Sequence, residues 1–290
     1  MEFTKVGNEA VMALTVGTIV AFVVPLVSAI IWKVKKKERF TTMLVGAVSF
    51  IVFALLLEKM IQNALLFPTQ MMLPSHPIAE FFSAHPVLLA FMVGLFPGVF
   101  EETGRLIMFK TLLRKRKNRE TSISYGIGHG GIEVMLILGL TYVTYLIYAA
   151  TINSGTFGMI VDQIKAQAPD QLEAILAIPD QIASFTFSAL LVNVIERIFA
   201  VLFHIGASIL VFYACKDKTK FSLYPLAILL HTLVDFAAGL TVLGVVQIPM
   251  VVVEGIMVVF GSLTFGLTYV YLYKKDKDIG IEKNNISIDK

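Results

Sequence analysis

Seven long apolar segments, each bounded by polar residues, dominate this chain of 290 residues. A helix needs about 20 apolar residues to cross the hydrocarbon core of a bilayer, and inside that core the backbone must satisfy its own hydrogen bonds. We therefore predict an all-α bundle of about seven transmembrane helices, which occupy residues 10–33, 40–67, 86–110, 122–150, 185–214, 221–246 and 250–273.

The composition agrees with a chain that is nearly all membrane. Apolar residues make up 57% and charged residues 16%, whereas about 25% of the residues in a soluble domain are charged. No polar stretch is long enough for a separate soluble domain, so residues 1–290 are predicted to form a single integral membrane domain. Cys215 is the only cysteine, which excludes an internal disulfide.

The basic residues predict how the chain is oriented. They follow the first, third, fifth and seventh segments, and residues 110–119 hold six of them. Residues 68–85 hold none, and residues 151–184 hold only Lys165. Because positive loops stay in the cytoplasm, we predict a multi-pass plasma-membrane protein with its N-terminus outside and its C-terminal tail cytoplasmic. The net charge of +3 sits at segment ends and gives no sign of nucleic-acid binding. Residues 160–169 and 171–178 are predicted to be short amphipathic helices at the interface.

Ionisable residues inside four of the apolar segments are the strongest functional signal. A carboxylate within hydrocarbon costs about 2.5–3.5 kcal/mol on insertion scales, yet Glu101 and Glu102 lie side by side in the third segment. The next three segments carry His129, His204 and His231. At 1.5 Å per residue, all lie ~10–20 Å from the predicted cytoplasmic boundary. One ion pair can be a helix clasp and one histidine a simple hydrogen-bonding group, but the joint pattern favours an active site.

Helical spacing predicts partners for these groups. Residues four apart share a face, so Arg105 is expected to hold Glu101, while Glu102 points about 100° away. The same spacing pairs His129 with Glu133 and His231 with Asp235, and the fifth segment carries a polar stripe of Asn193, Glu196, Arg197 and His204. Glycines around His129 predict close helix packing, and Pro97 is expected to free a backbone carbonyl near the site.

This set of residues suits hydrolysis of a peptide bond. The reaction needs an activated water, a proton donor and a group that stabilises the oxyanion. A desolvated glutamate such as Glu101 can act as the base, with histidines beside it. Alternatively, His129, His204 and His231 could hold zinc and leave one position open for water. The H-E-x-x-H zinc signature is absent. The residues thus make no cofactor certain, and zinc stays open.

The ordered motifs resemble those of the YhfC family of intramembrane peptidases. They are Glu101-Glu102 with Arg105, Gly128-His129 with Glu133, Glu196-Arg197 with His204, and His231 with Asp235. That family is similar to the CAAX prenyl endopeptidases, the bacteriocin-processing and immunity proteases and the PrsW-type proteases. The resemblance covers residues 85–246. It implies a catalytic core there, with accessory spans at residues 10–33, 40–67 and 250–273.

The resemblance also implies roles for individual residues. Glu101 matches the glutamate that activates water, Glu102 and Arg105 complete that motif, and Asp235 matches the side chain that assists the oxyanion. Asp235 replaces the asparagine of the prenyl enzymes, and Arg105 follows after two residues where they have three. These departures put a prenylated substrate in doubt more than hydrolysis. The candidate site residues are Glu101, Glu102, Arg105, His129, Glu133, Glu196, Arg197, His204, His231 and Asp235.

Two other function classes fit an ionisable layer in a membrane. One is a transporter coupled to protons or cations, although the chain shows no second half resembling the first, as many transporters do. The other is a non-catalytic scaffold or immunity protein. On the favoured hypothesis of an intramembrane endopeptidase, the partners are a membrane protein or peptide substrate and the lipid bilayer.

Overall fold

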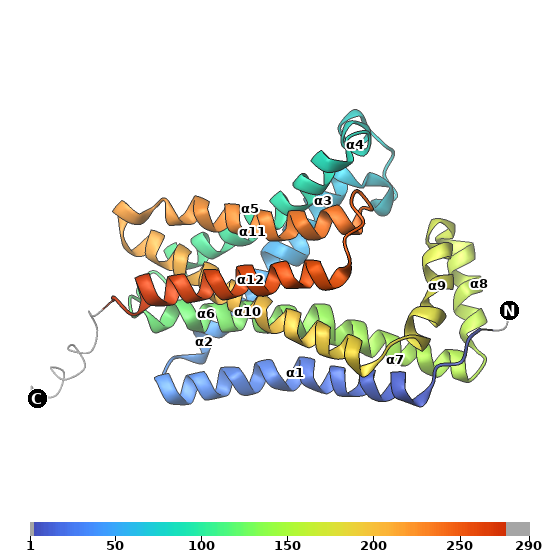
Figure 1. Cartoon of the computed structure of the whole chain (residues 1–290). Helices are drawn as coiled ribbons and strands as arrows, with labels where there is room; N and C mark the ends of the chain where they lie inside the picture. The colour runs from blue at the N-terminus through green and yellow to red at the C-terminus, as the bar shows by residue number, and fades with distance from the viewer. Residues whose placement is uncertain (1–2, 277–290) are drawn as a thin grey trace, which may run out of the picture. The chain divides into compact units, whose positions relative to one another are not determined.

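The computed structural model describes residues 3–276, and this part of the chain is helical with no strand (Figure 1). The C-terminal tail after Lys277 lies outside the described residues. The α-helices are α1 (Asn8–Lys36), α2 (Phe40–Ser49), α3 (Lys59–Leu66), α4 (Pro77–Ser83), α5 (Pro86–Lys110), α6 (Glu120–Glu133), α7 (Leu140–Asn153), α8 (Phe157–Gln167), α9 (Leu172–Ala183), α10 (Phe187–Lys216), α11 (Leu223–Val242) and α12 (Met250–Thr268).

The predicted seven spans are confirmed. Within the described residues, seven helical stretches are long and apolar enough to cross a membrane. Their ends differ from the predicted ones by a few residues, and they run Asn8–Lys36, Phe40–Leu66, Pro86–Lys110, Glu120–Asn153, Phe187–Lys216, Lys218–Val242 and Val251–Tyr273. The chain is therefore a multi-pass membrane protein.

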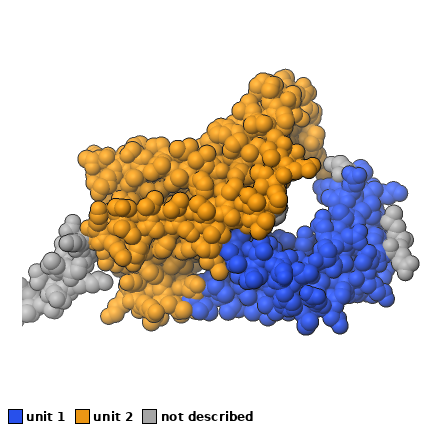
Figure 2. Space-filling model, in the orientation of Figure 1, with its two compact units in different colours: residues 1–27, 133–197 blue, residues 28–132, 198–290 orange. Residues whose placement is uncertain are grey.

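The chain forms two compact units (Figure 2). Unit 1 comprises Met1–Val27 and Glu133–Arg197, and unit 2 comprises Ser28–Ile132 and Ile198–Lys290. The predicted catalytic core at residues 85–246, with its accessory spans, is a different division of the chain and stays a prediction.

Unit 1 contains the two short amphipathic helices that the sequence predicts. They are α8 and α9, which lie beside each other in Figure 1. Their apolar faces pack into one core with α7, where Tyr142, Phe157 and Ile182 are almost fully buried. In the same unit, a side chain on Gly17 would meet the ring of Tyr142, so small residues let these helices approach closely.

Unit 2 is organised around the antiparallel pair α5 and α11. Its close approach depends on glycines spaced four residues apart on α5. A Cβ added to Gly94 would lie 2.5 Å from the backbone nitrogen of Phe236, and one added to Gly98 would lie 2.9 Å from the carbonyl of Ile228. Further along, Thr103 hydrogen-bonds the hydroxyl of Tyr224 at 2.8 Å. This seam brings the next turn of α5, which carries the two glutamates, against α11.

The glycines around His129 behave as predicted. A Cβ on Gly126 would meet the backbone of Ile205 on α10, and a Cβ on Gly128 would collide with the carbonyl of Met43 on α2. Helix α6 is thus wedged between two neighbours, and His129 is completely buried between them.

Pro97 frees a carbonyl, as predicted, while α5 continues through it from Pro86 to Lys110. Proline has no N–H, so the carbonyl of Val93, four residues earlier, loses its helical donor. The side chain of Gln62 on α3 donates to that oxygen at 3.2 Å. A buried polar side chain of the second span therefore replaces the missing backbone bond and ties α3 to α5.

Three spans contain π-helical stretches that the sequence analysis does not predict. They are η1 (Phe50–Glu58), η3 (Val134–Gly139) and η6 (Tyr269–Tyr273). A π-turn rotates the following side chains relative to a regular α-helix and is frequent at functional sites. In η1 it sets the direction of Glu58, the last residue of the stretch.

Candidate active site

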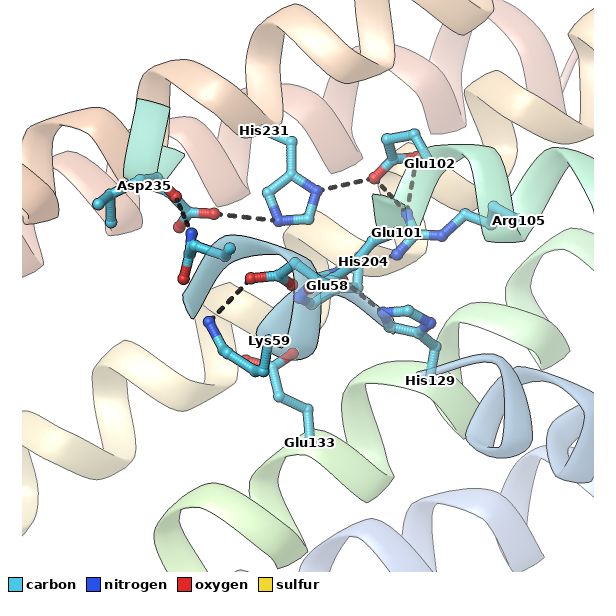
Figure 3. Close-up of polar contacts among 12 residues, drawn as sticks. Glu58, Lys59, Glu101, Glu102, Arg105, His129, Glu133, His204, His231 and Asp235 are labelled. Atoms are coloured by element: carbon cyan, nitrogen blue, oxygen red, sulfur yellow. Dashed lines mark hydrogen bonds and ion pairs between the residues drawn. The ribbon is translucent and has the colours of Figure 1, made fainter. Parts of the chain in front are cut away.

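Seven ionisable side chains of unit 2 converge in one largely buried group (Figure 3). Helix α5 supplies two carboxylates and a guanidinium, and three other helices each supply one histidine. The residues are Glu101, Glu102 and Arg105 of α5, His129 of α6, His204 of α10, and His231 and Asp235 of α11. Seven of the ten predicted site residues therefore lie together.

Glu102 and Arg105 form the fully buried centre of this group. The Arg105 guanidinium donates to both Glu102 oxygens, at 2.9 and 3.1 Å, and both side chains have 0% exposure. The prediction that Glu102, about 100° from Glu101 on the helix, cannot pair with Arg105 is therefore wrong. Residues three apart are also neighbours on a helix, and the long arginine side chain reaches the carboxylate one turn earlier.

Arg105 also contacts His204, with 3.0 Å between Nη2 and Nδ1. Because a guanidinium can only donate, Nδ1 of His204 must accept in this contact. When His204 is neutral, its proton is therefore on Nε2. The same Nδ1 lies 3.9 Å from an oxygen of Glu101, so a cation placed near Glu101 would compete with Arg105 for this lone pair.

Glu101 is held by the histidine of the neighbouring helix. Nε2 of His129 lies 2.8 Å from Oε2 of Glu101. The ring of His129 packs edge-on against Phe50, and its Nδ1 is buried without a hydrogen-bond partner among the described residues. Glu101 itself is 6% exposed. The α5 carboxylates thus have separate surroundings, Glu101 beside imidazoles and Glu102 beside a guanidinium.

His231 is bracketed by two carboxylates. Its Nδ1 lies 2.9 Å from Glu102, and its Nε2 lies 3.4 Å from Asp235, which confirms the predicted pairing with Asp235. A neutral ring that donates from Nδ1 has a lone pair on Nε2, and the facing carboxylate is also an acceptor. A proton or a metal ion at Nε2 would relieve that conflict. The Asp235 side chain is 32% exposed and is the most accessible member of the group.

Three side chains of the group are placed to share a metal ion. One ligand atom each from Glu101, His204 and His231 lies within 4.8 Å of the others. Atoms bound to one zinc ion at about 2.1 Å are at most ~4.2 Å apart, so modest closure would suffice, and two imidazoles with one carboxylate are a familiar catalytic zinc set. The second carboxylate, Glu102, orients His231 as outer carboxylates orient metal-binding histidines. The residues fit a divalent metal. The sequence analysis proposes His129, His204 and His231 as zinc ligands, whereas the residues that lie close together here are Glu101, His204 and His231. His129 as a ligand stays a prediction.

The remaining three predicted site residues, Glu133, Glu196 and Arg197, form a cluster in unit 1. Arg197 donates to Glu133 at 2.8 Å and makes an ion pair with Glu196. Both glutamates are 8% exposed. Within unit 1 these contacts are those of a charged clasp between helices, and a role for this cluster in catalysis stays a prediction.

Glu58 and Lys59, at the junction of η1 and α3, are the site residues that the sequence analysis misses. Glu58 is 1% exposed and pairs with Lys59 at 2.8 Å, and it is near enough to His231 to interact electrostatically (Figure 3). Its charge inside an apolar run is the same signal that identified Glu101, but a single Glu-Lys neighbour pair in the second span carries no motif. With these two, the six charged side chains Glu58, Lys59, Glu101, Glu102, Arg105 and Asp235 comprise four carboxylates and two cations, a formal charge of −2 that a divalent ion would balance.

Comparison with known proteins places the chain in a family. No solved structure matches it. The uncharacterized membrane protein YhfC of Bacillus subtilis (strain 168) is 32% identical over 243 residues, which cover 83% of this chain and 89% of that protein. A family model described as YhfC intramembrane metalloprotease matches residues 20–257, which is wider than the motif region at 85–246 and includes Glu58. The chain belongs to the YhfC intramembrane metalloprotease family.

Proposed function

We propose that this chain is an intramembrane endopeptidase that hydrolyses a peptide bond of a membrane-associated protein or peptide, with a divalent metal bound by Glu101, His204 and His231. One observation carries the proposal: these three side chains come from three different membrane-spanning helices, yet their donor atoms lie within 4.8 Å of one another in a buried layer. The description of the family as metalloproteases supports the same reading.

When bound, the metal would polarise a carbonyl oxygen and lower the pKa of a water molecule. The protein's own groups supply the rest. Glu101 would take the proton of the attacking water on the carboxylate oxygen that does not bind the metal, and the hydrogen bond from Nε2 of His129 to Oε2 fixes the orientation of that carboxylate. Glu102 holds His231 in one tautomer, and Arg105 fixes Glu102 by two hydrogen bonds.

Asp235 is the group best placed to exchange protons with water. It is the most exposed carboxylate in the site and faces Nε2 of His231. A protonated Asp235 carboxyl would give its proton to the leaving amine, which must be protonated before it departs. This differs from the oxyanion role that the family resemblance suggests for the same position, and an ionised carboxylate cannot donate to an oxyanion.

The test compares peptide ends in membranes from cells that express wild type, Glu101→Gln or Glu173→Gln at matched levels. Glu173→Gln removes the same charge from an exposed position on α9 of unit 1, which is not a candidate site residue. New peptide ends present with wild type and Glu173→Gln but absent with Glu101→Gln support proteolysis and identify a substrate. Equal peptide profiles in all three would refute it and favour transport or scaffolding.

Metal binding is tested separately on the purified chain. We expect about one zinc ion per chain in wild type and none in His204→Ala/His231→Ala, measured by elemental analysis after dialysis. Proteolysis by a wild-type chain that holds no metal would leave Glu101 as the base of a metal-free, glutamate-dependent peptidase and remove the metal from the proposal.

A further inference from the structure

The connections between four membrane-spanning helices enclose an open cavity of about 1200 Å³ in unit 2. One wall is residues 36–39, between α1 and α2, and the other is residues 110–120, between α5 and α6. Eight of its thirteen lining residues are Lys or Arg and only two are Glu. The charge pattern of the chain predicts that this end of the helices is cytoplasmic.

The two walls are fastened to each other. Arg116 donates to Thr41 at 2.7 Å and also contacts Thr42, while Asn118 donates to Glu38. Lys37 holds a left-handed backbone conformation, with φ of 54°, where helices commonly end in glycine. The cavity is therefore a formed feature of two interlocked connections.

The cations that line the cavity outnumber the acids that line it, eight to two. Within residues 3–276, none of the lining Lys or Arg side chains forms an ion pair. Of the two lining acids, Glu38 is engaged by Asn118, and Glu120 pairs with Arg119, which is not part of the lining. By contrast, basic residues of the connection after α10 have carboxylate partners: Lys216 pairs with Asp276 and Lys220 with Asp217. Orientation alone requires basic residues at both places, so it does not explain why one set is gathered and unpaired.

An apolar edge distinguishes this cavity from a simple anion site. Leu112 lines it and is 66% exposed. Just before the other wall, Val34 at the end of α1 is 69% exposed. A ligand that fits would carry negative charge beside a hydrocarbon portion, and basic pockets between membrane helices bind anionic headgroups in this way. We propose that the cavity binds the phosphate group of an anionic phospholipid headgroup.

The experiment measures lipid retained by the full-length chain in detergent, by native mass spectrometry, after addition of phosphatidylglycerol or phosphatidylcholine. The test variant is Arg114→Gln/Lys115→Gln/Lys117→Gln, whose three residues line the cavity and are exposed. The matched control is Lys218→Gln/Lys274→Gln/Lys275→Gln, which removes as much charge from exposed positions outside the lining. Thermal unfolding checks that both variants remain folded. If the triple variant does not fold, Lys115→Gln alone replaces it as the test variant.

We expect wild type and control to retain phosphatidylglycerol over phosphatidylcholine, and the test variant to bind phosphatidylglycerol about tenfold more weakly or worse, since each basic residue near an anionic headgroup strengthens binding. Equal retention by wild type and test variant would overturn the site. Inorganic pyrophosphate, added alone in a calorimeter, separates the sources: binding of pyrophosphate without retention of phosphatidylglycerol would overturn the lipid assignment in favour of a soluble phosphate. None of these readouts depends on proteolysis.

Discussion

At the scale of single residues, the buried charges of unit 2 form a chain of shared partners. Arg105 hydrogen-bonds both Glu102 and His204, and Glu102 accepts hydrogen bonds from both Arg105 and His231. In a site with no exposed surface at Arg105 or Glu102, removing one member leaves its partner charged and desolvated. Loss of activity in such a variant therefore does not by itself identify a residue that touches substrate, and stability must be measured beside it.

Glu102→Gln is predicted to be a stability variant before it is an activity variant. The substitution removes the charge that balances Arg105, and breaking a buried ion pair from one side costs about 3–5 kcal/mol. It also replaces the acceptor that orients His231. We expect a clearly lower melting temperature in detergent. Intrinsic fluorescence or circular dichroism during heating measures it.

The double variant Glu102→Gln/Arg105→Gln is the control for this effect. Because it removes both charges, most of the lost stability should return, while peptide cleavage should stay absent because His231 remains unoriented. A single Glu102→Gln variant as stable as wild type would show that Arg105 does not depend on Glu102.

Glu58 is predicted to strengthen cation binding from outside the ligand set. A buried carboxylate beside the group attracts a cation, and the neighbouring Lys59 ammonium offsets part of that attraction. We expect Glu58→Gln to weaken zinc binding by about tenfold. Competition with a fluorescent chelator measures this directly.

Lys59→Gln gives the matched comparison on the neighbouring residue. The Lys59 side chain is 51% exposed, whereas Glu58 is 1% exposed, so the lysine charge lies outside the buried group. Removing it should change zinc affinity little, and any change should be a gain. An equal loss of affinity in both variants would point to disturbed packing of η1 and α3 in place of an electrostatic role for Glu58.

At the scale of elements, the seam between α5 and α11 sets the geometry of the site. Gly94 and Gly98 touch the backbone of α11, and Glu102, one turn further, reaches His231. The spacing of four residues keeps all three on one face of α5. The distance between these helices thus decides whether the hydrogen bond from His231 to Glu102 can form.

Gly98→Ala is predicted to open this seam. Its new Cβ would lie 2.5 Å from the Thr232 hydroxyl and 2.9 Å from the Ile228 carbonyl, and the carbonyl, a backbone atom, cannot turn away as a side chain can. Overpacking of this kind costs about 1–3 kcal/mol, and peptide cleavage should fall with it. Gly266→Ala on α12 has open space around the new methyl group, so it should be neutral or stabilising by up to about 1 kcal/mol. Thermal unfolding of the two variants side by side tests both predictions. Equal melting temperatures for Gly98→Ala and Gly266→Ala would mean that α5 and α11 can separate at little cost in free energy.

The elements also show what the sequence can and cannot predict. Span lengths, the helices α8 and α9, and the gathering of Glu101, His129, His204 and His231 were predictable because apolar length and buried charge have strong, local signatures. The partner of Arg105 was not predictable, because carboxylates three and four residues away on a helix can both reach the guanidinium. Packing against α10 and α11 determines which of the two it binds. The π-helical turns were not predictable either, since their cause is packing between helices and no residue type marks them.

At the scale of the whole molecule, the distribution of basic residues predicts on which side of the membrane the basic cavity lies. The connections at residues 68–85 and 151–184 carry one basic residue between them, whereas those at 33–39, 110–119 and 216–220 are rich in Lys and Arg. Positive loops remain cytoplasmic, so Met159 in α8 is predicted to lie outside the cell and Lys218 inside. Both side chains are exposed, which makes them suitable positions for chemical labelling.

A single native cysteine makes the orientation directly measurable. In a Cys215→Ser background, Met159→Cys should react with a membrane-impermeant maleimide on intact cells, and Lys218→Cys should react only after the membrane is permeabilised. Labelling of both after permeabilisation shows that each thiol is accessible and the chain intact. The opposite pattern would place the basic cavity outside the cell, away from the leaflet whose anionic lipids attract basic segments, and would weaken the lipid proposal together with the orientation. The predicted pattern would place the cavity at the cytoplasmic leaflet, where an anionic headgroup can reach it from the bilayer.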